Sequence, residues 1–474
     1  MKKHAKTKIL ATLGPATESV ESLGAIIDQG VDAVRLNFSH NDHSYYEGVF
    51  KTIDKVRKEK KLPITVLQDL QGPKIRVGEL AEKEIELVSG ETIEITTEKV
   101  LGTKDLISTS YKPLPEDANV GDRVLIDDGL LHLRVQEKRE NSVICKIEEG
   151  GTLKPRKGMN LPGMRLSTPS VTEKDLADLE FALKHDIDYV ALSFVRDSND
   201  IIELRKWIKS KGYDIPIIAK IEKEEAVLNF EKILAHSDGI MVARGDLGVE
   251  LNPQAVPIIQ KNIIRRCNEV GKLVITATQM LESMINNPVP TRAEASDVAN
   301  AVLDGTDVVM LSAETSVGKY TSETVNIMND ILERAEANIH MKKRIKYETP
   351  QSLNDNILDA LGKGIAKMSD QVNVVSIIAL TEFGNRARVI SKFRPKVPVL
   401  AISSKFEVMN SINIHWGVKS IFYDYMGKED DAIQTAINYL KEKNIAKDGD
   451  IVLVTMGRPY TKEMKETNLR FIVV

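Results

Sequence analysis

The sequence predicts an α/β protein whose main part is a closed (β/α)8 TIM barrel, and two observations lead to this prediction. Short apolar runs alternate with amphipathic helical runs over most of the first 340 residues. Eight such apolar runs are found, which is the number of strands in a (β/α)8 barrel. The alternation is interrupted once by β-type sequence and resumes as a separate unit towards the C-terminus. A doubly wound open sheet is the alternative that the alternation by itself leaves open.

Each predicted strand is followed by a segment in which apolar residues recur three and four positions apart, as in a helix packed on a sheet. The strands are predicted at 6–14, 32–39, 64–70, 188–195, 215–222, 239–244, 272–279 and 307–314. The helices are predicted at 19–30, 45–61, 173–186, 200–212, 224–237, 255–271, 292–305 and 322–339. Strands that are apolar along their whole length indicate a parallel sheet covered by helices.

The interruption predicts an inserted all-β lid domain after the third strand. Segments such as 90–99 and 123–138 alternate with period two, are separated by turn residues, and lack helical periodicity nearby. From about residue 347, α/β alternation resumes with strand candidates such as 374–382 and 449–457. We therefore expect a catalytic barrel of residues 1–72 and 171–346, a β lid of 73–170, and a C-terminal α/β domain of 347–474 for regulation or oligomerisation.

Composition excludes several classes of protein. The chain has 474 residues, 42% hydrophobic and 28% charged, with a formal net charge of -4. This balance is typical of a soluble globular protein and gives no overall attraction to nucleic acid or anionic membranes. The two cysteines, Cys145 and Cys267, form neither a disulfide framework nor a zinc pattern. No secretory signal or membrane-spanning run is apparent, so we expect a cytoplasmic enzyme without membrane or nucleic-acid partners.

Polar residues collect where the predicted strands end, and in a barrel these ends share one face on which catalysis takes place. In chain order these residues are Arg35, Asn37, Ser39, His40, Asp69, Lys220, Glu222, Arg244, Gly245, Asp246, Thr278, Gln279, Ser312 and Glu314. A single charged pair at a strand end is more often a structural ion pair. Polar residues at the ends of several strands favour an active site instead.

Glu222 and Asp246 are hard oxygen donors on neighbouring strands, which suits Mg²⁺ with its remaining ligands supplied by substrate and water. The alternative is a carboxylate pair neutralised by Lys220 or Arg244. Beside a metal, Lys220 is suited to stabilising a developing oxyanion. A Schiff-base lysine would need a lowered pKa, and the neighbouring Glu222 argues against that.

The segment ARGDLG, residues 243–248, places two glycines around Asp246 at the predicted start of a loop. Their N–H groups would approach an anionic ligand closely, although an ordinary turn has the same composition. His40 and His43 have the spacing of zinc ligands on one helical turn, but no third ligand is evident. The sequence contains neither a P-loop nor a G-x-G-x-x-G motif, so a nucleotide would bind by other means.

Nearly the whole chain resembles the pyruvate kinase family. The matching motifs are RLNFSH, QDLQGPKIRVG, KGMNLPG, IIAKIE, GIMVARGDLGVE, ITATQMLESM, PTRAEASDVANAVLDGTDVVMLSAET and TNLRFIVV. Within the family the chain is similar to the bacterial short form without an extra C-terminal domain. The resemblance implies a barrel, a lid inserted after strand three and a C-terminal α/β domain. It also implies phosphoryl transfer from phosphoenolpyruvate to ADP, giving pyruvate and ATP in the last step of glycolysis.

The resemblance also implies roles for individual residues. It assigns catalysis to Lys220, Arg35, Thr278, Ser312 and Glu314, with Lys220 on the enolate and the last three near the proton relay. It assigns substrate binding to Arg35, Lys220, Gly245, Asp246 and Thr278, and Mg²⁺ or Mn²⁺ to Glu222 and Asp246. It assigns ADP and ATP binding to Asn37, His40, Arg76 and Lys157, the last two in or beside a lid that closes over the site.

One departure from the family concerns K⁺. The resemblance places the monovalent cation at Asn37, Ser39, Asp69 and Leu70, and K⁺-dependent members usually have Glu where this chain has Lys74. A lysine ammonium is itself a monovalent cation with three donors. We therefore expect Lys74 to replace K⁺, so that K⁺ is not required. The alternative is that Lys74 is a solvated surface residue.

A second departure concerns allosteric control. Phe383, Asn385 and Arg386 occupy a loop that in many members is rich in Ser and Thr and binds a sugar bisphosphate. A different sugar phosphate or AMP at Arg386, Lys392 or Arg458 is one expectation, and no effector is the other. A homotetramer is implied by the family only.

Two other functions are alternatives. A Mg²⁺-dependent barrel lyase or mutase acting on pyruvate enolates shares the carboxylate pair but does not explain Arg76, Lys157 or the lid. A catalytically silent metabolite-binding protein does not explain why Lys220, Glu222, Asp246 and Arg35 are all present.

Overall fold

The computed structural model describes residues 5–338, 345–350, 352–424, 428–458 and 466–474. Eight parallel strands close into a barrel, which confirms the predicted fold and excludes the open sheet. In chain order they are β1 (Lys8–Thr12), β2 (Ala33–Asn37), β3 (Thr65–Asp69), β12 (Tyr189–Leu192), β13 (Ile217–Ile221), β14 (Gly239–Ala243), β15 (Leu273–Ala277) and β16 (Val308–Leu311). β1 pairs with both β2 and β16, which closes the barrel.

Helices surround the barrel because each has one apolar face to bury against the strands. They are α1 (Val20–Gln29), α2 (His43–Lys60), α4 (Glu173–Ala182), α5 (Ser198–Ser210), α6 (Glu224–Leu228), α7 (Phe230–His236), α8 (Arg244–Glu250), α9 (Val256–Val270), the 3₁₀ helix η1 (Glu282–Ile285), α10 (Arg292–Asp304), α11 (Ala313–Ser316) and α12 (Thr321–Ala337). Capping boxes at Ser19, Thr172, Asp197 and Thr291 define where four of them begin. Within the described residues, none of the helices combines the length and apolarity that crossing a membrane would require.

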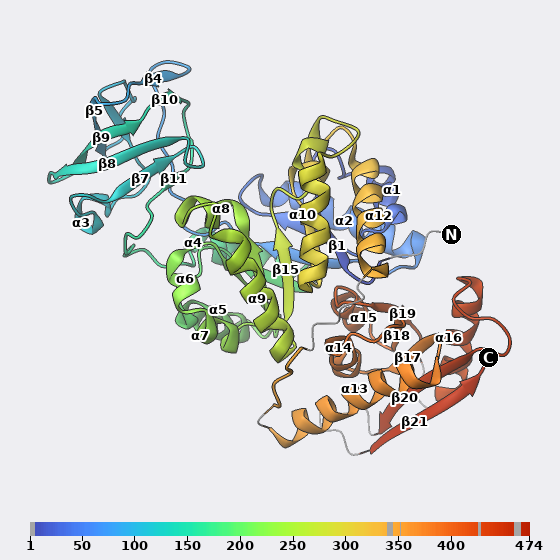
Figure 1. The fold of residues 1–474 in the computed structure, drawn as a ribbon. Coiled ribbons are helices and arrows are strands. Elements are labelled where there is room, and N and C mark those ends of the chain that lie inside the picture. Colours follow the sequence, from blue (N-terminus) through green and yellow to red (C-terminus); the bar gives the residue numbers. More distant parts are fainter. Residues whose placement is uncertain (1–4, 339–344, 351, 425–427, 459–465) are drawn as a thin grey trace.

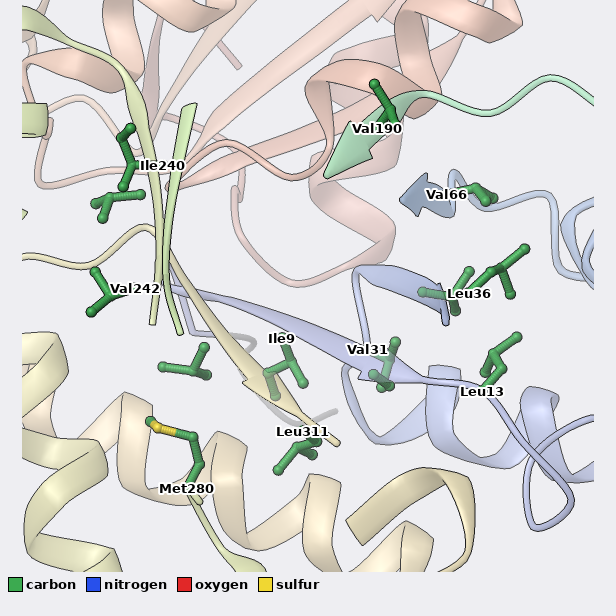
Figure 2. Packing of buried hydrophobic residues seen from close by; sticks show 14 of the residues in the cluster. Ile9, Leu13, Val31, Leu36, Val66, Val190, Ile240, Val242, Met280 and Leu311 are labelled. Carbon is green, nitrogen blue, oxygen red and sulfur yellow. The ribbon is translucent and has the colours of Figure 1, made fainter. Parts of the chain in front are cut away.

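The main core lies between strands and helices, where Figure 2 shows side chains from several strands pointing into it. Ile9, Val66, Val190 and Ile240 are each at most 1% exposed, so the strands are effectively sealed from water on this side. A second cluster, including Leu10, Leu67 and Ile218, fills the barrel interior. The rigid strands thereby fix the positions of the polar residues at their carboxyl ends.

The segment between β3 and α4 forms the lid. Six strands make one sheet in the order β11-β7-β8-β9-β5-β6, and β10 and β4 make a second. Their bounds are β4 (Ile85–Leu87), β5 (Thr92–Thr96), β6 (Leu106–Ser108), β7 (Arg123–Ile126), β8 (Leu131–Lys138), β9 (Ser142–Glu149), β10 (Gly151–Leu153) and β11 (Met159–Asn160). The lid has its own apolar core. The lid was predicted to be all-β, and within the described residues it departs from this only in the four-residue helix α3 (Leu114–Asp117).

The C-terminal domain is a five-stranded sheet in the order β19-β18-β17-β20-β21. Its elements are α13 (Leu353–Val372), β17 (Ser376–Leu380), α14 (Asn385–Lys392), β18 (Val399–Ser403), α15 (Phe406–Ile412), β19 (Val418–Phe422), α16 (Glu429–Glu442), β20 (Ile451–Arg458) and β21 (Glu466–Val473). β21 runs antiparallel to β20, whereas the other pairings are parallel. Figure 1 shows this domain and the lid projecting from different sides of the barrel.

Two local predictions were wrong. The loop expected at ARGDLG is the helix α8, which begins directly after β14 with Asp246 in its first turn, where a negative charge is favourable. The helix expected at 224–237 is divided into α6 and α7 at Asn229. The predicted strands at 307–314 and 188–195 also extend past β16 and β12, which end at Leu311 and Leu192.

A buried carboxylate at the amino-terminal end of the barrel yields the first testable prediction. Asp188 accepts a hydrogen bond from the Val66 amide (2.8 Å) and lies 3.3 Å from Arg57. Burial raises the pKa of Asp188 from 3.8 to about 7 despite the opposing effect of Arg57. Between these pH values the folded state holds a proton that the unfolded state releases. Stability should therefore fall as pH rises towards 7 and stay reduced above it.

Replacing this residue by asparagine keeps an acceptor for Val66 and removes the titration. We compare the melting temperature of Asp188→Asn with that of the unaltered protein at each pH. The variant's melting temperature minus that of the unaltered protein should be about 2–4 °C larger at pH 8 than at pH 5.5. Calorimetry of both proteins across this range measures the difference. Melting curves that run parallel with pH would contradict the assignment.

Candidate active site

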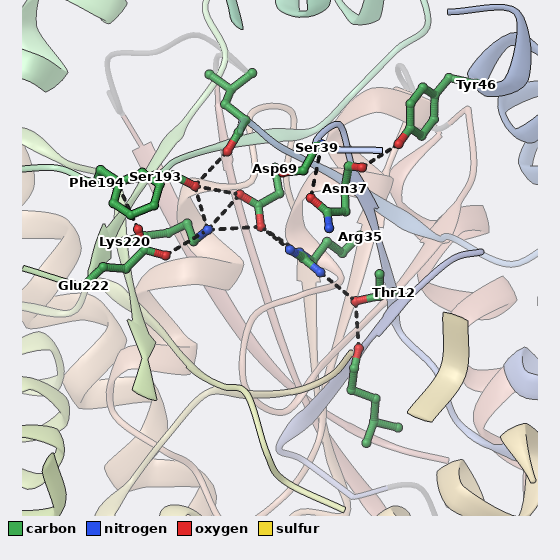
Figure 3. Close-up of polar contacts among 12 residues, drawn as sticks. Thr12, Arg35, Asn37, Ser39, Tyr46, Asp69, Ser193, Phe194, Lys220 and Glu222 are labelled. Atoms are coloured by element: carbon green, nitrogen blue, oxygen red, sulfur yellow. Dashed lines mark hydrogen bonds and ion pairs between the residues drawn. The ribbon is translucent and has the colours of Figure 1, made fainter. Parts of the chain in front are cut away.

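Lys220, the penultimate residue of β13, lies at the centre of a polar network formed by the ends of three neighbouring strands (Figure 3). Its Nζ donates to Ser193 Oγ at 2.6 Å and to Asp69 Oδ1 at 3.1 Å, and it lies 3.0 Å from Glu222 Oε1. The residue is only 9% exposed. Burial alone would lower the pKa of Lys220, but Asp69 and Glu222 raise it above its usual value. The side chain is therefore an ammonium ion and not a neutral amine.

Asp69 links Lys220 to Arg35. Arg35 Nε and Nη2 lie 2.7 and 2.6 Å from Asp69 Oδ2, and Arg35 Nη1 donates to Thr12 Oγ1 at 3.1 Å. Burial acts to raise the pKa of Asp69, but the charges of Lys220 and Arg35 outweigh it and lower the pKa. One buried carboxylate thus holds two cations side by side. Asp69 and Glu222 together balance the charges of Lys220 and Arg35, and the two fixed cations still offer charged donors to an anionic substrate.

Glu222 and Asp246 form the second part of the site. Glu222 Oε2 accepts a hydrogen bond from the Phe194 amide at 2.8 Å, and Phe194 has a left-handed backbone (φ 54°). Burial raises the pKa of Glu222, and Asp246 raises it further, although Lys220 opposes them. Asp246 is half-buried and, in the part of the chain that the structure describes, its carboxylate has no hydrogen-bond or ion-pair partner. Two repelling carboxylates, one of them unpartnered, are a donor pair that a divalent cation would stabilise.

The donor set fits Mg²⁺ better than zinc. Among the described residues no group of three or more His, Cys, Asp or Glu side chains is arranged to hold a metal. Two carboxylates with open positions are what Mg²⁺ uses when substrate oxygens and waters complete its shell. His43 is also not placed to bind zinc, because its Nε2 lies 2.8 Å from Asp178 Oδ1 and its ring stacks on Phe181.

Thr278 joins the first turn of α8, which follows β14, to the loop after β15. The Gly245 amide donates to Thr278 Oγ1 at 2.8 Å, and Thr278 Oγ1 donates to the Ala277 carbonyl at 2.7 Å. Thr278 and Gln279 both have left-handed backbones, with φ of 67° and 52°. Such strain in non-glycine residues persists only where the surroundings enforce it, and it is frequent at active sites. Arg244 supports this turn by donating to the Ala277 carbonyl at 3.1 Å and the Thr278 carbonyl at 2.6 Å.

Glu314 connects the loops after β15 and β16. Its carboxylate accepts hydrogen bonds from the Ser312 amide at 2.6 Å and the Leu281 amide at 3.1 Å. The residue is 1% exposed, and burial raises the pKa of Glu314. In this arrangement Glu314 holds backbone in place beside Thr278, and the half-buried Ser312 lies at the edge of the site.

The residues predicted to bind nucleotide are only partly brought together. Burial lowers the pKa of His40, and four nearby cations lower it further: Arg76, Lys74, Arg35 and Lys174. This concentration of positive charge adjoins the end of β2. Lys157, in contrast, pairs with Asp127 of the lid at 2.8 Å. A cleft of ≈ 1170 Å³ separates lid and barrel, lined on one side by Arg123 and His132 and on the other by Asp246.

The predicted monovalent-cation pocket is already largely satisfied by protein groups. Asp69 is paired with Arg35 and Lys220. The Leu70 carbonyl accepts a hydrogen bond from Ser193 Oγ at 2.7 Å, and Asn37 Oδ1 accepts one from the Ser39 amide at 3.3 Å. Lys74 is exposed at the root of the lid. Among the residues described, it donates to none of these oxygens, so the structure does not place its ammonium in the pocket.

The sequence reasoning missed Ser193 and the Phe194 amide, although they position Lys220 and Glu222. The signal was available, because Ser193 directly follows β12 as the other site residues follow their strands. Lys223, the residue after Glu222, forms a second buried ion pair with Glu250 at 2.6 Å. The sequence did not predict this pair.

Comparison with known proteins agrees with the fold. The family model for "Pyruvate kinase, barrel domain" matches residues 4–325, and that for "Pyruvate kinase, alpha/beta domain" matches residues 359–473. A pyruvate kinase of Clostridium perfringens is 43% identical over 459 residues, covering 96% of this chain and 96% of its own. "Pyruvate kinase 2" of Synechocystis is 43% identical over 456 residues, covering 95% of this chain and 76% of its own.

The structural comparison gives the same result. A crystal structure of a pyruvate kinase from Cryptosporidium parvum matches with a TM-score of 0.92 and 39% identity, covering 99% of this chain and 96% of that chain. Together, the fold and these matches define a phosphotransferase built on a (β/α)8 barrel. The chain belongs to the pyruvate kinase family.

Proposed function

We propose that this chain transfers the phosphoryl group of phosphoenolpyruvate to ADP, giving pyruvate and ATP, with Lys220 as the group that stabilises the enolate. The observation that carries the residue assignment is the Lys220 ammonium, held in a fixed position by Ser193, Asp69 and Glu222. In the reaction the bond between phosphorus and the enol oxygen breaks, and a bond from phosphorus to the terminal phosphate of ADP forms. Negative charge develops on the enol oxygen, and a fixed ammonium stabilises that charge without reorganising.

Arg35 is proposed to hold the transferring phosphoryl group. Its guanidinium is held by Asp69 and Thr12, and it lies on the same carboxylate as Lys220. The two cations are therefore positioned to bind neighbouring parts of one anion. Positioning and charge neutralisation are what phosphoryl transfer chiefly requires of a protein.

Glu222 and Asp246 are proposed to hold Mg²⁺, or Mn²⁺ in its place. The bound cation would neutralise charge on the substrate oxygens as the phosphoryl group leaves. In support, the Phe194 amide donates to Glu222 Oε2, and Asp246, in the first turn of α8, is near enough to raise the pKa of Glu222. The Gly245 amide and Thr278 are proposed to contact the carboxylate side of phosphoenolpyruvate.

Proton delivery to the enolate is proposed to take place near Thr278, Ser312 and Glu314. The Thr278 hydroxyl lies at a strained turn, and Glu314 holds the adjoining loops through two backbone amides. Asn37, His40, Arg76 and Lys157 are proposed to bind ADP. Closure of the lid would bring Lys157 towards the cations around His40 and exclude water from the transferring group.

The chain is further proposed to work without K⁺, with Lys74 supplying the monovalent charge when the lid closes. Lys74 lies at the root of the lid, and its charge already lowers the pKa of His40. We predict equal initial rates, within about twofold, in KCl and in choline chloride at the same ionic strength. The variant Lys74→Glu is predicted to lose activity in choline chloride and recover it in KCl. A strict K⁺ requirement in the unaltered protein would refute this assignment.

Initial rates with and without ADP test the main proposal. Pyruvate and ATP formed together, and only when ADP and Mg²⁺ are both present, are the expected result. Pyruvate released without ADP would instead support the lyase alternative. A homotetramer and an anionic effector of the C-terminal domain are also proposed, by analogy with the family.

The structure describes the side chains of two of the three effector-binding candidates, Arg386 and Lys392. Arg386 donates to Thr455 and Thr467, whereas Lys392 pairs with Asp359, so these two cations have different neighbours. The side chain of Arg458 and the following loop lie outside the described residues. Arg386 is the candidate that contacts strands β20 and β21.

A further inference from the structure

A cavity of ≈ 430 Å³ lies between the amino-terminal end of the barrel and the C-terminal domain. Tyr189 and Leu273 begin β12 and β15, and Asp238 directly precedes β14, so these three define the barrel side. Arg388 of α14 and His415, which follows α15, define the other side. The cavity is at the opposite ends of the strands from Lys220. Its volume is within the range of small-molecule sites, which often lie between domains.

The lining of this interdomain cavity is strongly basic. It contains three basic side chains, Arg205, Lys272 and Arg388, and one carboxylate, Asp238. Asp238 is already paired with Arg205 at 2.7 Å and also accepts a hydrogen bond from the Ile217 amide at 2.8 Å. Two positive charges therefore remain without an acidic side chain in the lining to neutralise them.

The two remaining cations are positioned differently. Lys272 Nζ donates to the carbonyls of Leu234, Ala235 and Ser237 at the end of α7, which fixes it in place. Arg388 donates one hydrogen bond, to the Phe383 carbonyl at 3.1 Å, and within the described ranges no carboxylate pairs with it. Most of its donors are therefore available. Lys272 uses its three N–H groups on its three carbonyl partners and contributes only its positive charge. The partly free guanidinium of Arg388 suits a phosphate group, which it recognises through paired N–H groups.

The remaining polar groups suit a hydroxylated body attached to that phosphate. Tyr189 Oη donates to the Ser411 carbonyl at 3.0 Å and lies 3.4 Å from His415 Nε2. Burial lowers the pKa of His415, and the nearby cations Arg388 and Lys8 lower it further. His415 is therefore neutral and offers one donor and one acceptor, in addition to the hydroxyl oxygen of Tyr189.

We propose that the interdomain cavity is a binding site for a small phosphorylated, hydroxylated metabolite such as a sugar monophosphate. The site is separate from the catalytic face and from the Arg386 region of the C-terminal domain. It contacts both domains at once. Through β15, which runs from Leu273 at the cavity to Ala277 beside Thr278, it is connected to the active site by a single strand.

The test is titration calorimetry of the full chain with ribose 5-phosphate, with ribose as the uncharged control. Arg388→Gln removes the free guanidinium, and Arg334→Gln, at an exposed position of α12, is the matched control. Ribose 5-phosphate should bind, with an affinity at least about tenfold weaker in Arg388→Gln, since one charge-assisted hydrogen bond contributes at least that much. The affinity of Arg334→Gln should remain within about twofold of the unaltered protein.

Equal affinity in Arg388→Gln and the unaltered protein would overturn the proposal, because binding would then lie elsewhere, including at the catalytic face. Absence of any binding by ribose 5-phosphate in the unaltered protein would overturn it as well. The measurement does not depend on turnover. A protein that bound the ligand through Arg388 but lacked kinase activity would support this site and refute the proposed function.

Discussion

Replacing Lys220 by methionine is expected to lower kcat by about a thousandfold, because the fixed charge that stabilises the developing enolate is lost. Methionine fills nearly the same volume without a charge, so the cavity that alanine would leave is avoided. The half-saturating concentration of phosphoenolpyruvate should change much less than kcat. The reason is that Lys220 acts mainly on charge that appears during the reaction, whereas Arg35 remains to bind the phosphoryl group.

Steady-state kinetics of Lys220→Met, beside Lys206→Met as a control at an exposed position of α5, measure this effect. The substitution also leaves Glu222 without its cation, so the melting temperature of the variant should be recorded to establish that it is folded. A folded Lys220→Met protein that retained more than about a tenth of the normal kcat would contradict the role given to Lys220.

Replacing Glu222 by glutamine is expected to have the second largest effect, on the affinity for the divalent cation. Glutamine keeps an oxygen for the Phe194 amide but removes one of the two negative charges that attract the metal. Even residues that only support metal ligands change metal affinity about 10- to 100-fold, and loss of a ligand charge should cost at least as much. The Mg²⁺ concentration that gives half-maximal rate should rise accordingly.

Direct binding of Mn²⁺, followed by electron paramagnetic resonance, provides a readout that does not depend on activity. Glu224→Gln is the matched control, since Glu224 is exposed and only two residues away. It should bind Mn²⁺ as the unaltered protein does. If Glu222→Gln bound Mn²⁺ equally well, the carboxylate pair would be a structural ion-pair partner of Lys220 and not a metal site.

The sequence predicted the architecture well because apolar periodicity reports directly on burial. All eight barrel strands fall inside predicted segments, since a strand covered on both sides must be apolar along its length. The ends of the elements were less accurate. At ARGDLG two glycines indicated a loop, and the structure has α8, because packing of Leu247 into the core outweighs the low helix propensity of glycine.

The sequence predicted which residues form the site but not the contacts that position them. Placing polar residues at strand ends identified Arg35, Asp69, Lys220 and Glu222, which the structure brings into one network. The partners that position them could not be predicted with equal ease. The Phe194 amide has no side-chain signature, and its left-handed backbone depends on contacts between distant segments. The position of Lys74 depends on where the lid stands relative to the barrel, which local sequence does not determine.

The most direct test of the central claim is the fate of phosphorus, followed by ³¹P nuclear magnetic resonance with phosphoenolpyruvate, ADP and Mg²⁺. The account predicts that each phosphoenolpyruvate consumed yields one ATP, and that no inorganic phosphate accumulates while ADP remains. Phosphoenolpyruvate that is consumed to give inorganic phosphate, with ADP unchanged, would contradict phosphoryl transfer and favour the lyase alternative.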